Sequence, residues 1–337
     1  MSRSPVHAAS SVRYRLPVQE DDPPTFAVIG EALIDLATPA TDGSAVARPG
    51  GSPMNVAVGL ARLGERTAFA GRLSTDPFGA IIRQHLERSG VDLRHVVTAA
   101  ERSTIALVRL AGGHATYEYA LGADFNWSAD ELAFLPGGAL AVHFGSLASW
   151  LPPGSAAIAA AISRLRRSGS VLISYDPNVR PALQPDAVSA RQQIEQSVTL
   201  AHLVRASLDD VHWLYGPGAD VDAVAGMWLA LGARLVVITM GADGATAWVS
   251  GQPPVSRTAF LTAVTDTVGA GDAFTSGLLD ALSRRDLLAP GSLTALGDTA
   301  KLAGILDEAS RIAAIACRRP GADPPNRAEA DSWPAAF

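Results

Sequence analysis

One stretch near the C-terminal end of the chain decides the fold: Val264-Thr265-Asp266-Thr267-Val268-Gly269-Ala270-Gly271-Asp272-Ala273-Phe274-Thr275-Ser276-Gly277. Two glycines flank an alanine, an aspartate follows at once, and apolar residues then recur with helical spacing. The pattern predicts a glycine turn that feeds a helix, with Asp272 as its first residue or cap. Helix starts attract anions, so the stretch is a candidate phosphate site. Asp272 either caps the helix or takes a proton from a group that attacks the phosphate.

A second glycine pair, Gly50 and Gly51, precedes another predicted helix. Ser52 followed by Pro53 is expected to form the N-cap and first helical position. Asn55 then lies in the first turn, where its side chain either faces a ligand or is solvated. Upstream, Asp35 interrupts an apolar segment and is either a turn or strand-end residue or a ligand-binding group.

The remaining chain alternates strand-like and helix-like segments. This alternation predicts an α/β fold with a doubly wound, mainly parallel sheet flanked by helices, in which ligands bind at the carboxyl ends of the strands. The expected strands are 26–30, 141–145, 171–176, 202–206, 235–240 and 245–249. The expected helices, besides those after Gly51 and Gly271, are 76–90, 155–167, 186–197 and 220–231.

Two segments interrupt this alternation, at about 36–48 and 103–122. The second contains two strand-like runs around a glycine turn, the pattern of a hairpin. Together they are predicted to form a small β-sheet lid inserted in one domain that spans residues 25–330. Residues 1–24 lack the apolar core of a signal peptide and are expected to be a disordered tail. Residues 331–337 are expected to be a C-terminal tail.

The composition limits the class of protein. Of 337 residues, 48% are hydrophobic and 18% charged, as expected for a globular protein with a large core. A net charge of −6 argues against nucleic acid or an anionic membrane as the main partner. The single cysteine, Cys317, cannot form an internal disulfide. No apolar run approaches the roughly 18–20 residues of a membrane span. We therefore expect a cytoplasmic protein.

Several common catalytic motifs are absent from the sequence. There is no GxxxxGK[ST] loop, and Phe274 stands where a GxGxxG pattern needs its last glycine. There is no HExxH and no CxxC, and Ser207 lacks the glycines of a nucleophile elbow. A nucleotide site must therefore use backbone amides and strand-end loops.

The chain resembles the PfkB carbohydrate kinases, the ribokinase family, over roughly residues 25–325. Two signatures carry the resemblance: Gly50-Gly51-Ser52-Pro53-Met54-Asn55-Val56-Ala57 and Asp266-Thr267-Val268-Gly269-Ala270-Gly271-Asp272-Ala273-Phe274. They occur in the family's order, with Thr239-Met240-Gly241-Ala242-Asp243-Gly244 between them. The segments 176–181 and 317–325 are most similar to bacterial fructokinase-type members. The resemblance implies a ribokinase-like fold with a lid.

The resemblance also implies roles for individual residues. Asp272 matches the catalytic base, and the backbone of Gly269, Ala270 and Gly271 matches the anion hole for the transferred phosphate. The candidate substrate-binding residues are Asp35, Gly50, Gly51, Asn55, Arg109, Tyr119 and Arg180. The candidate nucleotide-binding residues are Ser207, Asp210, Thr239, Gly241, Gly244, Thr267, Gly269 and Gly271. Asp266 matches a monovalent-cation loop, which implies K⁺.

Two positions depart from the family pattern. Many members have an Asn and, three positions later, a Glu near the magnesium and phosphates, where this chain has Ser207 and Asp210. Asp210 is therefore a candidate Mg²⁺ ligand with a shorter reach. Fructokinase-like members often carry an arginine after the aromatic lid strand, where Ala120 follows Tyr119. This difference weakens the case for fructose itself.

The predicted activity is phosphoryl transfer from ATP with Mg²⁺ to a primary hydroxyl of a small sugar, with fructose as the first candidate. The alternative acceptors are 2-keto-3-deoxygluconate, ribose and a nucleoside, and Arg109 or Arg180 can meet a sugar-acid carboxylate. A different class of function is a non-catalytic sugar or nucleotide sensor on the same scaffold. Asp272 and its glycines favour the enzyme. A homodimer through the lid strands is a further expectation.

Overall fold

An eight-stranded sheet forms the centre of the computed structural model, which describes residues 24–38, 45–111, 114–135, 138–184 and 186–333. The strand order is β14-β13-β12-β11-β10-β9-β1-β4. The six strands from β4 to β12 run parallel, and β13 and β14 add an antiparallel edge. The strands are β1 (Phe26–Ile29), β4 (Thr67–Ala70), β9 (Ala141–Gly145), β10 (Leu172–Asp176), β11 (Leu203–Ser207), β12 (Leu235–Thr239), β13 (Ala245–Val249) and β14 (Val255–Arg257).

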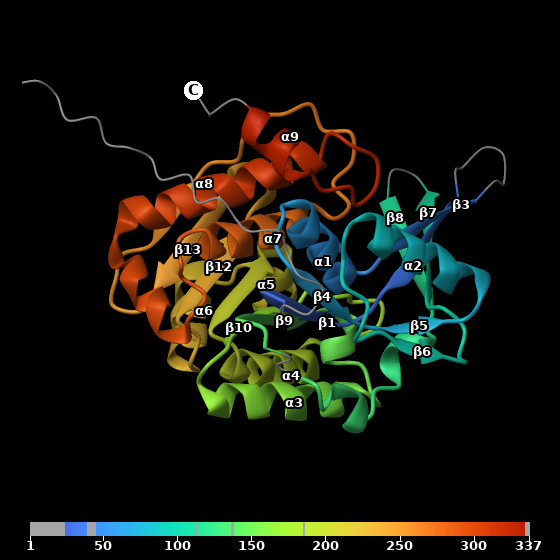
Figure 1. Ribbon diagram of the computed structural model, residues 1–337. Helices are drawn as coiled ribbons and strands as arrows, with labels where there is room; N and C mark the ends of the chain where they lie inside the picture. The colour runs from blue at the N-terminus through green and yellow to red at the C-terminus, as the bar shows by residue number, and fades with distance from the viewer. Residues whose placement is uncertain (1–23, 39–44, 112–113, 136–137, 185, 334–337) are drawn as a thin grey trace, which may run out of the picture.

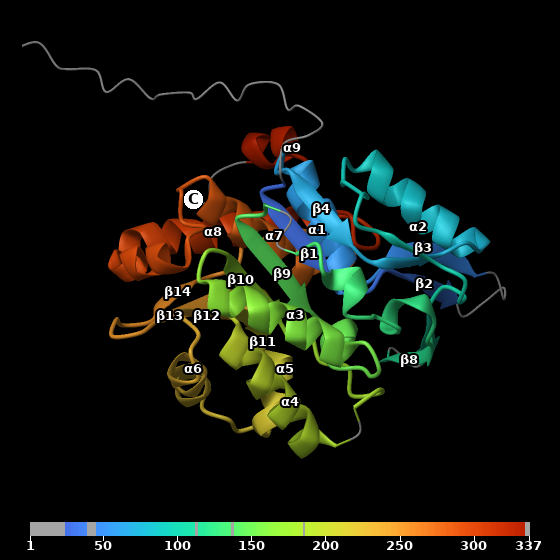
Figure 2. The same cartoon turned by 60° about the horizontal axis from the view of Figure 1, so that its bottom comes forward.

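Helices cover both faces of this sheet, which confirms the doubly wound α/β fold (Figures 1 and 2). One core lies between the sheet and α1, α2, α7 and α8, and the other between the sheet and α3 to α6. Central strands such as β9 and β10 are buried along their whole length, as their unbroken apolar sequences predict. The helices are α1 (Ser52–Arg62), α2 (Pro77–Arg88), α3 (Ser155–Ser168), α4 (Ala187–Leu200), α5 (Leu208–Tyr215), α6 (Val221–Ala230), α7 (Ala270–Ser283), α8 (Thr299–Ala316) and α9 (Arg327–Ser332).

A second, four-stranded sheet stands to one side of the main sheet, next to α2 (Figure 1). Its order is β3-β2-β7-β8, and only β2 and β7 pair in parallel. Its strands are β2 (Leu33–Thr38), β3 (Val46–Gly50), β7 (Ile105–Ala111) and β8 (His114–Ala120). A small parallel pair joins β5 (Arg72–Ser74) to β6 (Val97–Ala99). The predicted hairpin is present, although its glycine turn at 112–113 lies outside the described residues.

The second sheet begins earlier than the sequence suggested. Asp35 lies within β2, where it pairs with Arg48 on one side and Ala106 on the other. The expectation that Asp35 ends a strand or lies in a turn was therefore wrong. The apolar residues around it alternate between the faces of this sheet.

Glycines, not polar side chains, occupy the N-cap positions of α1 and α7. Gly51 is the N-cap of α1 with φ of 107°, and a Cβ there would lie 2.8 Å from the Glu31 carbonyl oxygen. Gly269 is the N-cap of α7 with φ of 73°, so Asp272 is the third helical residue. The expectation that Ser52 caps α1 was therefore wrong, since Ser52 is the first helical residue. The expectation that Asp272 caps or starts α7 was wrong as well. Positive φ angles favour glycine at both turns. Because glycines take the cap positions, the side chains of Ser52 and Asp272 are available for other contacts.

The described part of the chain begins at residue 24 and ends at residue 333. Residues 1–23 and 334–337, which hold most of the two predicted tails, lie outside the described residues. Helix α9 continues to Ser332, past the predicted domain end at 330. Among the described residues, no helix has the length and apolar character that a membrane crossing requires.

Candidate active site

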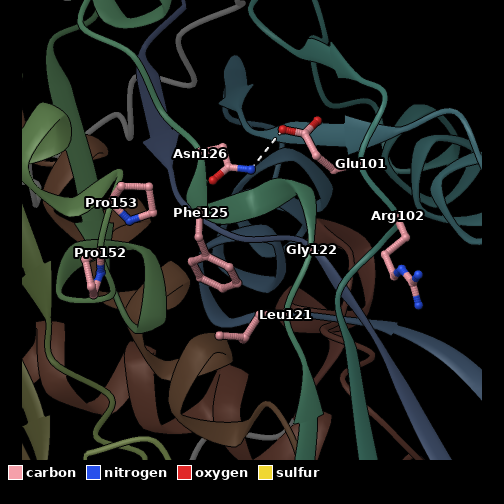
Figure 3. A pocket seen from close by; sticks show the side chains of 8 residues that line it. All are labelled: Glu101, Arg102, Leu121, Gly122, Phe125, Asn126, Pro152 and Pro153. Atoms are coloured by element: carbon pink, nitrogen blue, oxygen red, sulfur yellow. Dashed lines mark hydrogen bonds between the residues drawn. The ribbon is translucent and has the colours of Figure 1, made fainter.

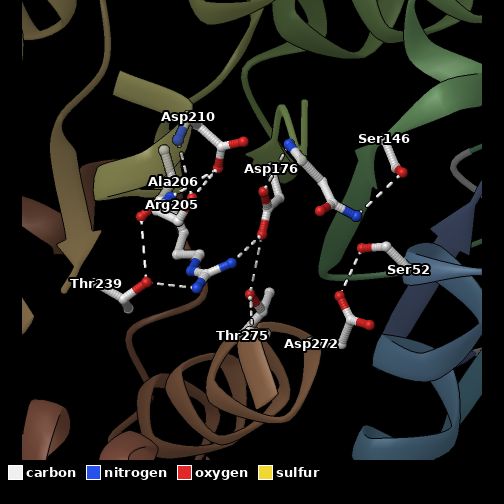
Figure 4. A network of polar contacts seen from close by, with 12 residues as sticks. Ser52, Ser146, Asp176, Arg205, Ala206, Asp210, Thr239, Asp272 and Thr275 are labelled. Atoms are coloured by element: carbon white, nitrogen blue, oxygen red, sulfur yellow. Dashed lines mark hydrogen bonds and ion pairs between the residues drawn. The ribbon is translucent and has the colours of Figure 1, made fainter. Parts of the chain in front are cut away.

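Asp272 is the centre of a buried polar cluster at the start of α7. Ser52 Oγ donates a hydrogen bond to Asp272 Oδ1 at 2.6 Å, and Asn55 Nδ2 donates to Oδ2 at 2.8 Å. Both donors come from the first turn of α1, which packs beside α7. Each oxygen of the carboxylate is thus fixed by one donor (Figure 4 shows the Ser52 contact). The side chain of Asp272 makes no cap for its own helix.

Ser52 was missed as a site residue because a serine before a proline is a common helix cap. Its spacing of three residues from Asn55 was the available signal, since positions i and i+3 share one helix face. Asn55 was expected to face a ligand, and its amide instead holds Asp272. Its Oδ1 atom is buried and has no hydrogen-bond partner among the described residues.

The pKa of Asp272 lies well above that of an ordinary aspartate. Burial raises the pKa from 3.8 to about 6, although the hydrogen bonds from Ser52 and Asn55 act in the opposite direction. The negative charge of Asp176 raises it further, and the positive charge of Arg205 lowers it. A carboxylate with this pKa is mostly ionised at neutral pH, yet it can accept a proton.

Asp35 lies near Asp272, on the second sheet. Burial raises the pKa of Asp35 to about 6, with the charge of Asp272 acting in the same direction and that of Arg180 against it. Gly50 in the neighbouring strand makes room for this carboxylate, since a Cβ on Gly50 would lie 2.1 Å from Asp35 Oδ2. Asp35, Asp272 and Arg180 therefore lie close enough for their charges to act on one another.

Arg180 is the cation of this region. Its Nη1 donates to the carbonyl oxygen of Val179 at 2.9 Å. Burial alone would lower the pKa of the guanidinium, but Tyr119 and then the acidic side chains Asp210, Asp272 and Glu31 raise it on balance. Arg180 thus stays charged beside the acidic groups.

The two predicted lid residues, Tyr119 and Arg109, lie on β8 and β7. Tyr119 pairs with Ala106 and packs against the core, and its ring oxygen acts electrostatically on Arg180. The side chain of Arg109 lies outside the described part, so its predicted contact with a substrate stays a prediction.

A salt bridge that sequence reasoning missed lies beside Asp272. Arg205 Nη1 donates to Asp176 Oδ2 at 2.9 Å, and Arg205 Nη2 donates to Thr239 Oγ1 at 2.5 Å. Thr275 Oγ1 of α7 approaches the same Asp176 oxygen at 3.5 Å. The network joins three strand ends to α7 (Figure 4). A lone arginine in an otherwise apolar strand was the available signal.

Asp266 holds the glycine turn in place through one contact within its own loop and one with a distant segment of the chain. Asp266 Oδ1 accepts from Val268 N at 3.0 Å, and its Oδ2 accepts from Gly321 N at 2.7 Å. Ala270 N donates to the Thr267 carbonyl at 3.1 Å. Among the described residues, the amides of Gly271 and Asp272 have no backbone acceptor. The amide of Ala270, which the sequence predicted for the anion hole, is therefore already engaged, whereas those of Gly271 and Asp272 can be offered to an anion.

Asp210 has both carboxylate oxygens engaged within the protein. Ser207 forms a capping box with it at the start of α5, where Asp210 Oδ2 accepts from Ser207 N at 2.8 Å and from Ser207 Oγ at 2.6 Å. Its Oδ1 accepts from Val179 N at 2.8 Å. A Mg²⁺ ion would have to compete with these donors. The described residues contain no cluster of three or more His, Cys, Asp or Glu that would hold a metal, so the direct Mg²⁺ contact stays a prediction.

The end of β12 leads into a tight turn that holds two predicted nucleotide-binding glycines. Gly241 and Gly244 have φ angles of 56° and 98°. A Cβ on Gly244 would lie 2.0 Å from the Arg257 carbonyl oxygen, whereas one on Gly241 would meet open space. Gly244 is thus required for packing, and Gly241 leaves the strand end open.

A pocket of about 550 Å³ lies away from this cluster, just after β8. Asn126 Nδ2 donates to Glu101 Oε1 across it at 2.9 Å (Figure 3). None of the predicted site residues lines it. Its lining residues are Glu101, Arg102, Leu121, Gly122, Phe125, Asn126, Pro152 and Pro153.

The doubly wound sheet, the smaller sheet beside it and the carboxylate at a glycine helix start define a ribokinase-like phosphotransferase. The family model described as "pfkB family carbohydrate kinase" matches residues 24–329. The chain belongs to this family and is a carbohydrate kinase.

Individual relatives support the same assignment. A fructokinase of Rhizobium leguminosarum bv. trifolii is 36% identical over 277 residues, which cover 80% of this chain and 83% of that protein. The structure of Xylella fastidiosa fructokinase with bound ATP has a TM-score of 0.84 at 26% identity, covering 91% of this chain and 97% of that one. The structure of Vibrio cholerae O395 fructokinase with fructose, ADP and calcium ion has a TM-score of 0.78 at 28% identity, with the same two coverages.

Proposed function

We propose that this kinase transfers the γ-phosphate of ATP to a primary hydroxyl of a fructose-like sugar, with Asp272 as the general base. One observation carries the proposal: a buried carboxylate with a raised pKa is held by two donors at the start of a helix whose Gly271 and Asp272 amides have no backbone acceptor among the described residues. The fructokinase relatives support a fructose-like acceptor.

In the proposed reaction, an Asp272 oxygen accepts the proton of the sugar hydroxyl. The hydroxyl oxygen bonds to the γ-phosphorus as the bond from that phosphorus to the bridging oxygen of ADP breaks. The amides of Gly271 and Asp272 stabilise the negative charge on the transferred group, with the rest of the 269–272 turn holding them in place. Ser52 and Asn55 keep the carboxylate aimed, because both of its oxygens are fixed.

The sugar is proposed to lie between Asp272 and the second sheet. Asn55 Oδ1 lacks a partner among the described residues and can accept from a sugar hydroxyl. Asp35 accepts from others, with Gly50 and Gly51 shaping the wall beside it. Arg180 balances the two acidic groups. Closure of the second sheet over the sugar would exclude water.

The nucleotide is proposed to lie across the ends of β11 and β12, near Thr239 and Gly241. Family structures contain ATP, or ADP with a calcium ion, and a metal on the phosphates supplies charge neutralisation. Ser207 and Gly244 shape the same edge. We propose the Asp266 loop as the site of a monovalent cation, and the edge strands of the second sheet as a homodimer contact.

A coupled ADP-release assay over a panel of acceptors tests the function. Fructose should give the strongest turnover. Strong turnover with 2-keto-3-deoxygluconate, ribose or a nucleoside alone would retain the kinase and replace the sugar. Absence of ADP release with every acceptor, together with measurable sugar or nucleotide binding, would instead identify a sensor.

The base role predicts a pH dependence. Asp272 must be ionised to accept a proton, so kcat/KM for the sugar should be half-maximal near pH 6, approach its maximum about one pH unit above, and fall about tenfold per unit well below it. Asp35, Asp176, Arg180 and Arg205 face this carboxylate. Because Asp35 has a similar pKa, the measured midpoint belongs to the coupled pair. A profile that stays flat down to about pH 5 would argue against the base.

Asp35→Ala should weaken sugar binding and leave ATP binding intact. The substitution removes a hydroxyl acceptor on the second sheet, far from the predicted nucleotide edge. A lost hydrogen bond to a charged group corresponds to about 10-fold or more in Kd. Calorimetry with each ligand measures both effects, and an equal loss for sugar and ATP would indicate that Asp35 has a structural role.

A further inference from the structure

Arg205 is a buried cation that the proposed reaction does not yet use. It lies on β11 and is 6% exposed. Its two terminal nitrogens bind Asp176 and Thr239, but Nε is buried without a partner among the described residues. Its guanidinium carbon lies 5.9 Å from the centre of the Phe274 ring in α7. Burying an arginine this deeply carries a large desolvation cost, so a compensating role is expected.

The guanidinium lies directly against the glycine turn. A Cβ on Gly271 would be 2.6 Å from Arg205 Nη1 and 2.9 Å from Nη2. Only a glycine lets the turn and the cation approach this closely. The same side chain thus lies against the proposed anion hole. It also binds the predicted nucleotide residue Thr239 and Asp176 (Figure 4).

The pair Arg205–Asp176 also affects the pKa of Asp272. The two charges have opposite effects on the Asp272 carboxylate: the cation favours its ionised form and the anion its protonated form. Thr275 of α7 approaches the same Asp176 oxygen, so the pair and the base are connected through one helix. Such an arrangement can set the pKa of Asp272 and also hold the glycine turn in place.

We propose that Arg205 is a positioning residue of the phosphoryl-transfer centre. Its buried guanidinium holds the Gly271 turn and Thr239 in register and supplies a fixed positive charge behind the transferred phosphate, and Asp176 orients it. The inference rests on the proposed function, because it assigns to Arg205 a task in the same reaction.

Three variants separate this role from simple structural support. Arg205→Met removes the charge and keeps the stem, Arg205→Lys keeps the charge, and the double variant R205M/D176N removes both buried charges together. We expect Arg205→Met to lower kcat/KM by roughly 10²-fold, because small misplacements at a transfer centre cost that much. Arg205→Lys should recover part of the activity. The double variant should fold at least as stably as Arg205→Met, since no unpaired buried charge remains, but stay slow.

A second measurement does not depend on turnover. The carboxyl carbon of Asp272 is followed by NMR in full-length protein labelled at aspartate, with its signal assigned from Asp272→Asn. Its titration midpoint should rise in Arg205→Met and fall in Asp176→Asn. A merely structural role of Arg205 would not shift the titration midpoint of Asp272 in opposite directions in the two variants. The other groups that face Asp272, Asp35 and Arg180, are unchanged in both.

The two readouts distinguish failure of the inference from failure of the proposed function. If no acceptor makes the wild-type protein release ADP, the proposed function fails. The assignment of Arg205 to phosphoryl transfer then fails with it, while the titrations still report the coupling of Arg205 to Asp272. If the wild type is active but Arg205→Met keeps near-normal kcat/KM, the inference alone is overturned. Unchanged titration midpoints in both variants would also overturn it.

Discussion

Asp272→Asn is expected to lower turnover by about 10²-fold or more, the usual scale for loss of a general base. Asparagine has nearly the same shape but cannot accept the proton of the sugar hydroxyl. It also cannot accept from both Ser52 and Asn55, which now each donate to one oxygen of the carboxylate. Steady-state kinetics with the best acceptor measures the effect.

The fold of Asp272→Asn should have near-normal stability, because two changes offset each other. The folded-state pKa of Asp272 is raised from 3.8 to about 6, so ionising this group destabilises the fold progressively as pH rises through that range, and the cost is fully present above it. Asparagine removes that cost, on the order of 3 kcal/mol. It also leaves one donor unpaired, which costs about 1–3 kcal/mol. Thermal unfolding near neutral pH measures the net result.

Asp130→Asn is a matched control for this experiment. Asp130 is exposed in a short turn after the second sheet, so the same chemical change should affect neither turnover nor stability. If Asp272→Asn retained near-normal turnover beside this control, Asp272 would not be the base.

Gly271→Ala is expected to lower turnover nearly as much as Asp272→Asn does. The new methyl group would lie 2.6 Å from Arg205 Nη1, and this guanidinium cannot retreat without breaking its contacts to Asp176 and Thr239. Either the turn or the cation must move, and a shift of about 1 Å at a transfer centre costs roughly 10²-fold in rate. Overpacking of this kind costs about 1–3 kcal/mol in stability.

Gly226→Ala is the control for this substitution. Gly226 is also helical, in α6, but a Cβ there meets nothing within 4 Å. Alanine should stabilise that helix by about 0.5–1 kcal/mol and leave kinetics unchanged. Kinetics and thermal unfolding of both variants are compared. Equal, near-normal turnover in the two would mean that the close approach of Arg205 to the turn has no role in the reaction.

The secondary structure could be predicted well because its signals are local. Strand β9 has the bounds 141–145 that its apolar run predicts, and α3 begins at the predicted residue. Asp186 and Asp220 begin their predicted helices, each as an N-cap whose side chain accepts from backbone amides. Such patterns depend on neighbours in sequence, which the sequence displays directly.

The helix starts at the site were harder to predict for the same reason. Ser52 and Asp272 are good capping residues, so local rules assign them to their own helices. In the structure, glycines with positive φ take the cap positions, and the two side chains bind each other across 220 residues of sequence. A long-range contact between two competent caps cannot be inferred from either segment alone.

The order of residues alone identifies the class of this protein: a doubly wound α/β kinase with a glycine turn, an aspartate and a second glycine-led helix. Short-range periodicity, turn chemistry and the order of motifs carry that information. The surroundings of the aspartate follow from tertiary packing instead: the two donors from α1, the acid on the second sheet, and the Arg205–Asp176 pair. Burial sets the pKa of these groups and makes their pairing necessary, and burial exists only once distant segments have packed together.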